Sequence, residues 1–262
     1  MYLRLRQIAL VARELEPVVD QLRQVLGIEV CYRAPGIIRR GLENALLPIG
    51  PIFIEVVAPV QPNTTAERFL ERRKGEGGYM YIMDCDNVGH RREHVKSLGI
   101  RIIAENKRAE FSPVEGFQLH PRDTGGAILS IATHAAGENL FGGFEWAGPN
   151  WQAFVRNEPL KDVLGAELQS DDPDQMARRW SEVLERPLSR APDGSPELKF
   201  DLGFARFVKD RDGRGEGLSA LHVEATDAER VLRSARAMAL KTTESAVEIC
   251  GTQFVLHQAT HD

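Results

Sequence analysis

One short pattern recurs four times along the chain, and it limits the folds that the chain can adopt. An apolar strand leads into an acidic or Asn turn, and an amphipathic helix follows. The strand–helix pairs are expected at residues 4–12 and 16–26, 78–84 and 87–98, 165–170 and 173–184, and 218–225 and 227–238. Asn and Asp at the start of a helix accept hydrogen bonds from its free N–H groups. Repetition of one supersecondary unit predicts a modular architecture.

Short strand candidates follow each helix, so the repeated unit is a βαβββ module. After the first helix they fall at residues 29–33, 41–47 and 52–57, and after the second at 101–105, 116–120 and 127–131. Such small modules cannot close a core alone, so they are expected to pair, the first with the second and the third with the fourth. The predicted fold is α+β, with four βαβββ modules that pair into two domains of mixed sheets. The predicted boundaries are residues 1–135, a linker at 136–157 and a more divergent domain at 158–262.

Two local motifs make the first half more specific. FLERRKGEGG reads as a helix followed by a glycine connector, and FQLHPRDTGGAIL reads as a strand, a tight turn and a second strand. Together they resemble the second half of a methylmalonyl-CoA epimerase-like domain of the vicinal oxygen chelate superfamily. The resemblance implies that the two domains are glyoxalase-like, with cup-shaped mixed sheets. The resemblance covers most of residues 5–132, and the second half of the chain resembles the superfamily only in general terms.

The resemblance implies a cup that holds a divalent metal, with one ligand from each of four strands. The usual His falls at Gln7, and the second ligand falls on Glu55, which matches the family. A second His falls at Met80 and the usual Glu at Ser130, while a proton-transfer carboxylate falls near Asn44. A thioether is a soft donor that does not suit hard divalent ions. We therefore expect at most a weakly bound divalent metal, on Glu55 and Gln7, and no tightly bound one.

Glu55 is the candidate catalytic residue, because it is a lone carboxylate inside an apolar strand. The alternative interpretation is a carboxylate that pairs with an arginine or faces solvent. Gln7, Asn44, Met80 and Ser130 are the candidate substrate-binding residues of the same cup.

His120 and Arg122 complete the candidate substrate-binding set, at the turn of the second motif. The alternative for His120 is a structural role in the hairpin. Arg122 is interpreted as a turn residue, with binding of a carboxylate or phosphate as the functional alternative. In the second half, Arg206 interrupts an apolar strand, and the interpretation favoured for it is an arginine on the solvent face of an edge strand. His222 is expected to be structural.

Net charge, cysteine spacing and the N-terminal residues limit the kinds of partner and the localisation that we expect. The net charge of −5 argues against a broad basic surface, so no nucleic-acid partner is expected. The three cysteines are widely spaced, which is typical of reduced thiols, and the charged N-terminus predicts neither a signal peptide nor a membrane span. We expect a cytoplasmic protein that binds a small molecule, with a homodimer as one oligomeric alternative.

Two functions remain open from the sequence. The first is a lyase, isomerase or dioxygenase that acts on a small organic acid, thioester or aromatic metabolite. The second is a non-catalytic binding or sequestration protein of the drug-resistance type.

Overall fold

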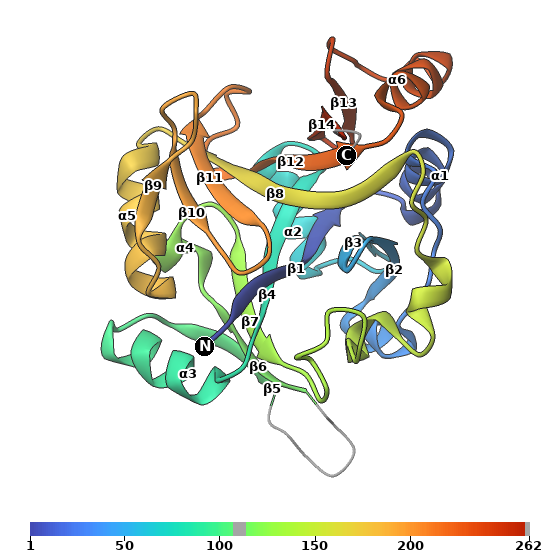
Figure 1. Ribbon diagram of the computed structural model, residues 1–262. Helices are drawn as coiled ribbons and strands as arrows, with labels where there is room; N and C mark the ends of the chain where they lie inside the picture. Colours follow the sequence, from blue (N-terminus) through green and yellow to red (C-terminus); the bar gives the residue numbers. More distant parts are fainter. Residues whose placement is uncertain (107–113, 260–262) are drawn as a thin grey trace. The chain divides into compact units, whose positions relative to one another are not determined.

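The computed structural model describes residues 1–106 and 114–259, and the expected recurrence is present (Figure 1). The four opening strand–helix pairs are β1 (Leu3–Val11) with α1 (Leu15–Leu26), β4 (Gly77–Cys85) with α3 (Val88–Ser97), β8 (Leu160–Ser170) with α5 (Pro173–Leu184), and β12 (Gly217–Ala225) with α6 (Ala228–Ala237). The later strands are β2 (Leu42–Ile49), β3 (Ile52–Pro59), β5 (Ile102–Asn106), β6 (Glu115–Leu119), β7 (Ile128–Thr133), β9 (Leu188–Arg190), β10 (Pro196–Lys199), β11 (Phe204–Lys209), β13 (Ala246–Ile249) and β14 (Thr252–Gln258). The remaining elements are α2 (Thr65–Arg73), α4 (Pro121–Thr124) and the 3₁₀ turns η1 (Pro35–Arg40), η2 (Glu145–Ala147) and η3 (Trp151–Phe154).

The helices begin and end where local chemistry requires it. Asn87, Asp172 and Asp227 each accept a hydrogen bond from the backbone N–H three residues later, at 2.9–3.0 Å. Gly27 ends α1 with φ of +68°, a left-handed conformation that glycine adopts without a Cβ clash. These caps confirm the helix boundaries that the sequence predicts.

Each module has the same internal strand order. The first strand runs parallel to the last one in β4–β7, β8–β11 and β12–β14, and the last strand pairs antiparallel with the strand before it. In the first module, β3 lies between β1 and β2. The α+β fold of four modules with open mixed sheets is therefore confirmed.

The second strand of the module is lost in two of the four copies. The strand expected at residues 29–33 is wrong, because only Tyr32 forms an isolated bridge, to Leu46. The fourth module has the equivalent bridge between Thr242 and Val247.

The chain divides into two compact units. The first unit comprises Met1–Gln7, Tyr79–Glu145 and Gly165–Leu218, and the second comprises Ile8–Gly78, Trp146–Leu164 and Ser219–Asp262. Each unit draws on both halves of the sequence, so the domain boundaries expected from the sequence stay a prediction.

The core of the first unit is centred on Trp180 of α5. Its ring makes edge contacts with Tyr81 and Phe207, at centroid distances of 5.4 and 5.7 Å. The Trp180 indole N–H donates to the Gly125 carbonyl at 3.3 Å, and the Tyr81 hydroxyl donates to the Phe204 carbonyl at 2.9 Å. Both buried polar atoms are thus satisfied, which is what a buried Trp or Tyr requires.

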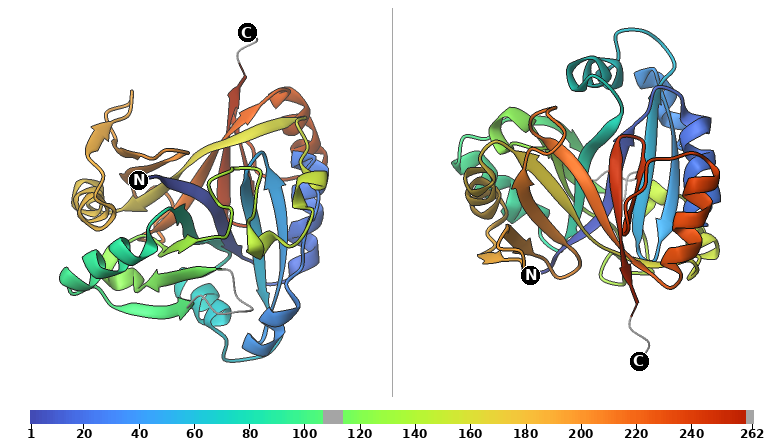
Figure 2. Two further views of the ribbon diagram at one scale, coloured as in Figure 1. Left: turned by 60° about the horizontal axis from the view of Figure 1, so that its bottom comes forward. Right: turned by 90° about the horizontal axis from the view of Figure 1, so that it is seen from above.

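In the second unit, α1 and α6 lie side by side (Figure 2). The α1 face that the sequence predicts, Val18, Leu22 and Val25, is buried. Trp151, from the expected linker, is also buried and makes an edge contact with Phe53 of β3 at 4.8 Å.

Candidate functional site

The hydrogen bonds around Asn44 fix the orientation of its side-chain amide. Oδ1 of Asn44 accepts the backbone N–H of Ala34 at 2.9 Å, so this atom is the carbonyl oxygen. The Nδ2 group then donates to Oε1 of Glu55 at 2.6 Å. Both side chains are buried, at 5% and 9% exposure.

The sheet register places this pair on a mostly apolar face of β2 and β3. Glu55 is opposite Leu46, Asn44 is opposite Val57, and Phe53 is two residues from Glu55 on the same face. The buried Trp151 ring packs on Phe53. The Asn44–Glu55 pair is thus a buried carboxylate held by an oriented amide on a mostly apolar face.

Gln7, Met80 and Ser130 lie in the first unit. Gln7 and Ser130 are each 2% exposed, and Met80 on β4 is half-buried. Met80 is opposite Ile128 and Ser130 is opposite Ile82, so both stand on the paired strands β4 and β7. Asn44 and Glu55 belong to the second unit, and the convergence of the two sets on one ligand stays a prediction.

The donor chemistry does not fit the metal that the superfamily resemblance implies. The set combines an amide, a thioether, a hydroxyl and one carboxylate, whereas hard divalent ions prefer several carboxylate or imidazole donors. Across residues 1–106 and 114–259, no group of three or more His, Cys, Asp or Glu side chains could hold a metal ion. No catalytic step is therefore derived through a metal.

His120 caps the short helix α4. Its Nδ1 accepts the backbone N–H of Arg122 at 3.1 Å, and the Arg122 side chain is exposed. Asp123, next along the chain, forms a two-pronged ion pair with Arg101 at 2.6 and 2.9 Å. The binding roles of His120 and Arg122 stay predictions.

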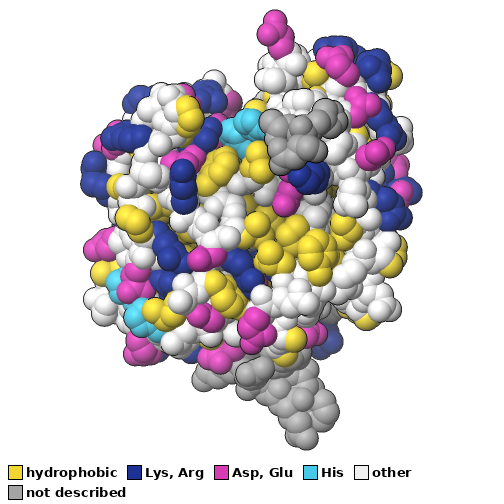
Figure 3. All heavy atoms as spheres, in the orientation of Figure 1, with side chains coloured by type: hydrophobic (Ala, Val, Ile, Leu, Met, Phe, Trp, Pro, Cys, Tyr) yellow, Lys and Arg dark blue, Asp and Glu magenta, His cyan; other side chains and the backbone are white. Residues whose placement is uncertain are grey.

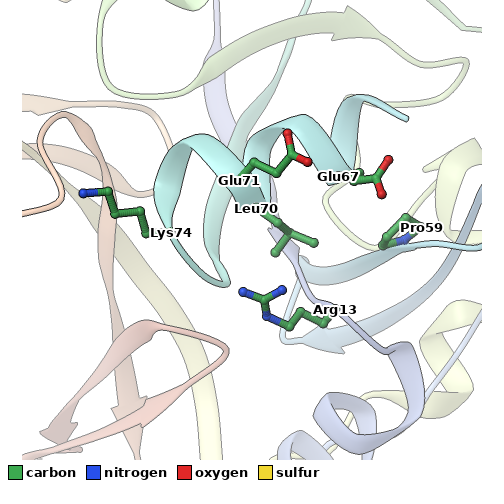
Figure 4. A pocket seen from close by; sticks show the side chains of 6 residues that line it. All are labelled: Arg13, Pro59, Glu67, Leu70, Glu71 and Lys74. Carbon is green, nitrogen blue, oxygen red and sulfur yellow. The ribbon is translucent and has the colours of Figure 1, made fainter. Parts of the chain in front are cut away.

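A groove of about 530 Å³ runs beside α2 in the second unit (Figure 4). Leu70 and Pro59 supply its apolar part. The remaining lining residues carry both signs of charge: Arg13, Glu67, Glu71 and Lys74. Its charges do not favour one class of ligand.

Sequence reasoning missed a buried ionic cluster in the first unit. Arg4 donates to both carboxylate oxygens of Asp84, at 2.8 and 3.0 Å, and Arg6 lies 3.7 Å from the same carboxylate. Next to them His134 is buried, and burial together with the nearby Arg6 charge lowers its pKa to about 3. The alternation RLR in β1 could have indicated a charged face, but it does not show that this face is covered.

The interpretation of Arg206 as a solvent-facing residue of an edge strand is wrong. β11 lies between β10 and β8, and Arg206 is opposite Glu197 on one side and Glu167 on the other. Two of its nitrogens donate to Glu197 Oε2, at 2.8 and 3.1 Å.

In the fourth module, Nδ1 of the buried His222 lies 2.7 Å from Nε2 of His257.

The charge distribution on the surface and the length of the helices bear on binding to nucleic acids and membranes. Basic and acidic side chains are interspersed on the face shown in Figure 3. None of the helices in the described part of the chain combines the length and the apolarity that a membrane span requires.

Comparisons with known proteins agree with this architecture. A family model described as a glyoxalase-like domain matches residues 8–184. Human mitochondrial methylmalonyl-CoA epimerase is 25% identical over 130 residues, which is 49% of this chain and 72% of the human protein. The mouse protein of the same name is also 25% identical over 130 residues, and 71% of it is covered.

The fold is also found at full length in a solved structure. A hypothetical protein from Staphylococcus aureus aligns over 99% of this chain and 100% of its own, with a TM-score of 0.66 and 11% sequence identity. At that identity the likeness concerns the fold alone.

Proposed function

Because the chain belongs to the glyoxalase-like domain family, we propose that it binds a small organic acid or acyl thioester on the β2–β3 face that carries Glu55. The observation that carries the proposal is the Asn44–Glu55 pair. It places one oriented, buried carboxylate on an apolar face, at the position where the superfamily resemblance puts a site residue. The relatives named methylmalonyl-CoA epimerase make an acyl thioester the first ligand to test.

Glu55 is the group proposed to act on the ligand. Its ionised carboxylate accepts a hydrogen bond from a ligand donor or takes a proton from an acidic C–H next to the thioester carbonyl. Asn44 serves as a positioning residue, because its amide fixes Oε1 of Glu55 and is itself fixed by Ala34 N–H. Proton transfer requires an ionised base.

The second candidate function is binding without turnover. Met80 and Ser130 stand where the resemblance places a His and a Glu, so two of the four donors of a metal-dependent reaction are missing. Weak or absent metal binding stays part of the proposal. Metal analysis of protein purified without chelator tests it, and stoichiometric metal that is lost on Glu55→Ala would contradict it.

Two measurements on one set of variants test the proposed function. Calorimetry measures the affinity for methylmalonyl-CoA. NMR in D₂O follows the exchange for deuterium of the C–H proton on the carbon that carries both the carboxylate and the thioester carbonyl. Glu55→Gln keeps the shape and removes the charge. It should change affinity or exchange at least about tenfold, or about 1.4 kcal/mol.

The matched control is Glu43→Gln, which removes a half-buried carboxylate one residue from Asn44. It should leave both measurements unchanged. Exchange that depends on Glu55 supports catalysis, and binding without exchange supports the sequestration alternative. Equal results for the two variants would make Glu55 a structural residue and remove the proposal.

A further inference from the structure

The buried ionic cluster of the first unit carries more positive than negative charge. Two guanidinium groups, Arg4 and Arg6, share one carboxylate, Asp84. Their side chains are 7%, 1% and 2% exposed. A buried charge that lacks a partner costs several kcal/mol unless an opposite charge compensates it.

Both carboxylate oxygens of Asp84 accept hydrogen bonds from Arg4. Nε and Nη2 of Arg4 each donate to a different oxygen of the Asp84 carboxylate, at 3.0 and 2.8 Å. Arg4 also donates to the carbonyls of Gly137 and Glu138. These bonds account for the guanidinium of Arg4 and for both oxygens of the carboxylate.

Arg6 is left with donors that are not used. Its Nη2 donates to the Leu140 carbonyl at 3.1 Å, but Nε and Nη1 have no hydrogen-bond partner among the described residues. Nη1 is 3.7 Å from Asp84, which is beyond hydrogen-bond distance. Buried polar atoms without a partner are rare, and each one calls for a missing water, ion or ligand.

Apart from Asp84, the neighbours of Arg6 that the structure describes supply no negative charge. The Phe144 ring lies 5.1 Å from the guanidinium carbon. His134, which packs on Phe144 at 4.4 Å, is neutral because its pKa is lowered to about 3. Burial raises the pKa of Tyr2, the aromatic partner of Arg4, to about 12, so this phenol is neutral as well. A water molecule could satisfy the N–H groups of Arg6 but would leave its charge uncompensated.

We propose that Arg6 is the anchor of a second binding site, which takes the carboxylate group of a small molecule. The anion receives hydrogen bonds from Nε and Nη1 and balances the charge of the cluster. Phe144 and the Leu140 carbonyl cover the guanidinium, so the anion enters when the segment between β7 and η2 moves. This site involves neither Glu55 nor Asn44, so its test is independent of the function proposed above.

The experiment measures thermal unfolding of the whole protein with sodium malonate against sodium chloride at equal ionic strength. Malonate should raise the Tm of the unmodified protein in a saturable manner. Arg6→Met keeps most of the side-chain volume and should weaken malonate binding at least about tenfold. Without malonate this variant should be as stable as the unmodified protein, because an uncompensated buried charge has been removed.

Two further variants separate an anion site from a structural ion pair. Arg206→Met removes a paired arginine of the same unit, so it should lower the Tm and retain the malonate shift. Asp84→Asn removes the only carboxylate of the cluster and should enlarge the shift. Acetate and propionyl-CoA distinguish a free carboxylate site from a site for thioesters.

The proposal is overturned by any of three results. These are no saturable shift with either malonate or acetate, a shift that survives Arg6→Met, or a shift that Asp84→Asn abolishes while the variant remains folded. If Arg6→Met does not fold, the Asp84→Asn result still decides the matter.

Discussion

Acid should destabilise this protein through one residue, His134. The side chain is 4% exposed, and its Nδ1 accepts the backbone N–H of Glu145 at 3.3 Å. Burial, with a smaller contribution from the Arg6 charge, lowers its pKa from 6.5 to about 3. The folded state therefore binds fewer protons than the unfolded state between these two values. The contribution of His134 to stability is fully present above about pH 6.5 and is lost as the pH falls toward 3.

The magnitude follows from the two pKa values. Linkage gives a loss of about 2 kcal/mol between about pH 8 and about pH 5, as an upper figure. For a chain of this size that corresponds to a fall in Tm of about 4–8 °C. His134→Gln keeps a hydrogen-bond acceptor for Glu145 N–H and has no titratable group.

Urea unfolding, followed by tryptophan fluorescence at three pH values, measures the effect. The variant is expected to be less stable than the unmodified protein at about pH 8, because packing on Phe144 is lost. This difference should shrink or reverse by about 2 kcal/mol at about pH 5. If the stabilities of the two proteins change in parallel with pH, His134 is not the acid-sensitive group, and the argument from its burial fails.

Three other substitutions test the account of the fold. Burial raises the pKa of Asp162 to about 6, so ionisation of this carboxyl opposes folding above its ordinary pKa near 3.8. Asp162→Asn should therefore raise the Tm more at about pH 7.5 than at about pH 4. Equal shifts at both pH values would contradict this. Tyr81→Phe removes the hydroxyl that donates to the Phe204 carbonyl. It should lower the free energy of unfolding in urea by about 1–3 kcal/mol, because that acceptor is left unsatisfied. An unchanged free energy would mean that water replaces the hydroxyl. Asp172→Ala removes the α5 cap and should cost about 1 kcal/mol in the same assay, which Asp172→Asn should largely restore.

The sequence predicts those features that depend on neighbouring residues. Asp172 and Asp227 indicate their helices because a cap acts within one turn, and the period of α1 shows which face is buried. The superfamily resemblance also identified Asn44 and Glu55 as candidates. That their side chains bond each other depends on strand register, which two separate strands do not show before they are paired.

The sequence could not show which side chains are buried by segments far away along the chain. Arg4 and Arg6 alternate with leucines, a pattern that indicates a solvent face in an isolated strand. In the structure, carbonyls more than 130 residues later in the chain cover these side chains. Nothing local distinguishes a charged face that will be covered from one that will not.

The ladder of Glu197, Arg206 and Glu167 also specifies how the third module assembles. β10 has only four residues, so its backbone hydrogen bonds alone distinguish weakly between neighbouring alignments with β11. A shift of β10 by one residue would place Arg206 opposite Leu198 or Pro196 in place of Glu197, and the ion pair with that buried carboxylate would be lost. The arginine thus penalises misaligned pairings as well as stabilising the correct one, and its removal should loosen the alignment of β10 in addition to lowering the stability.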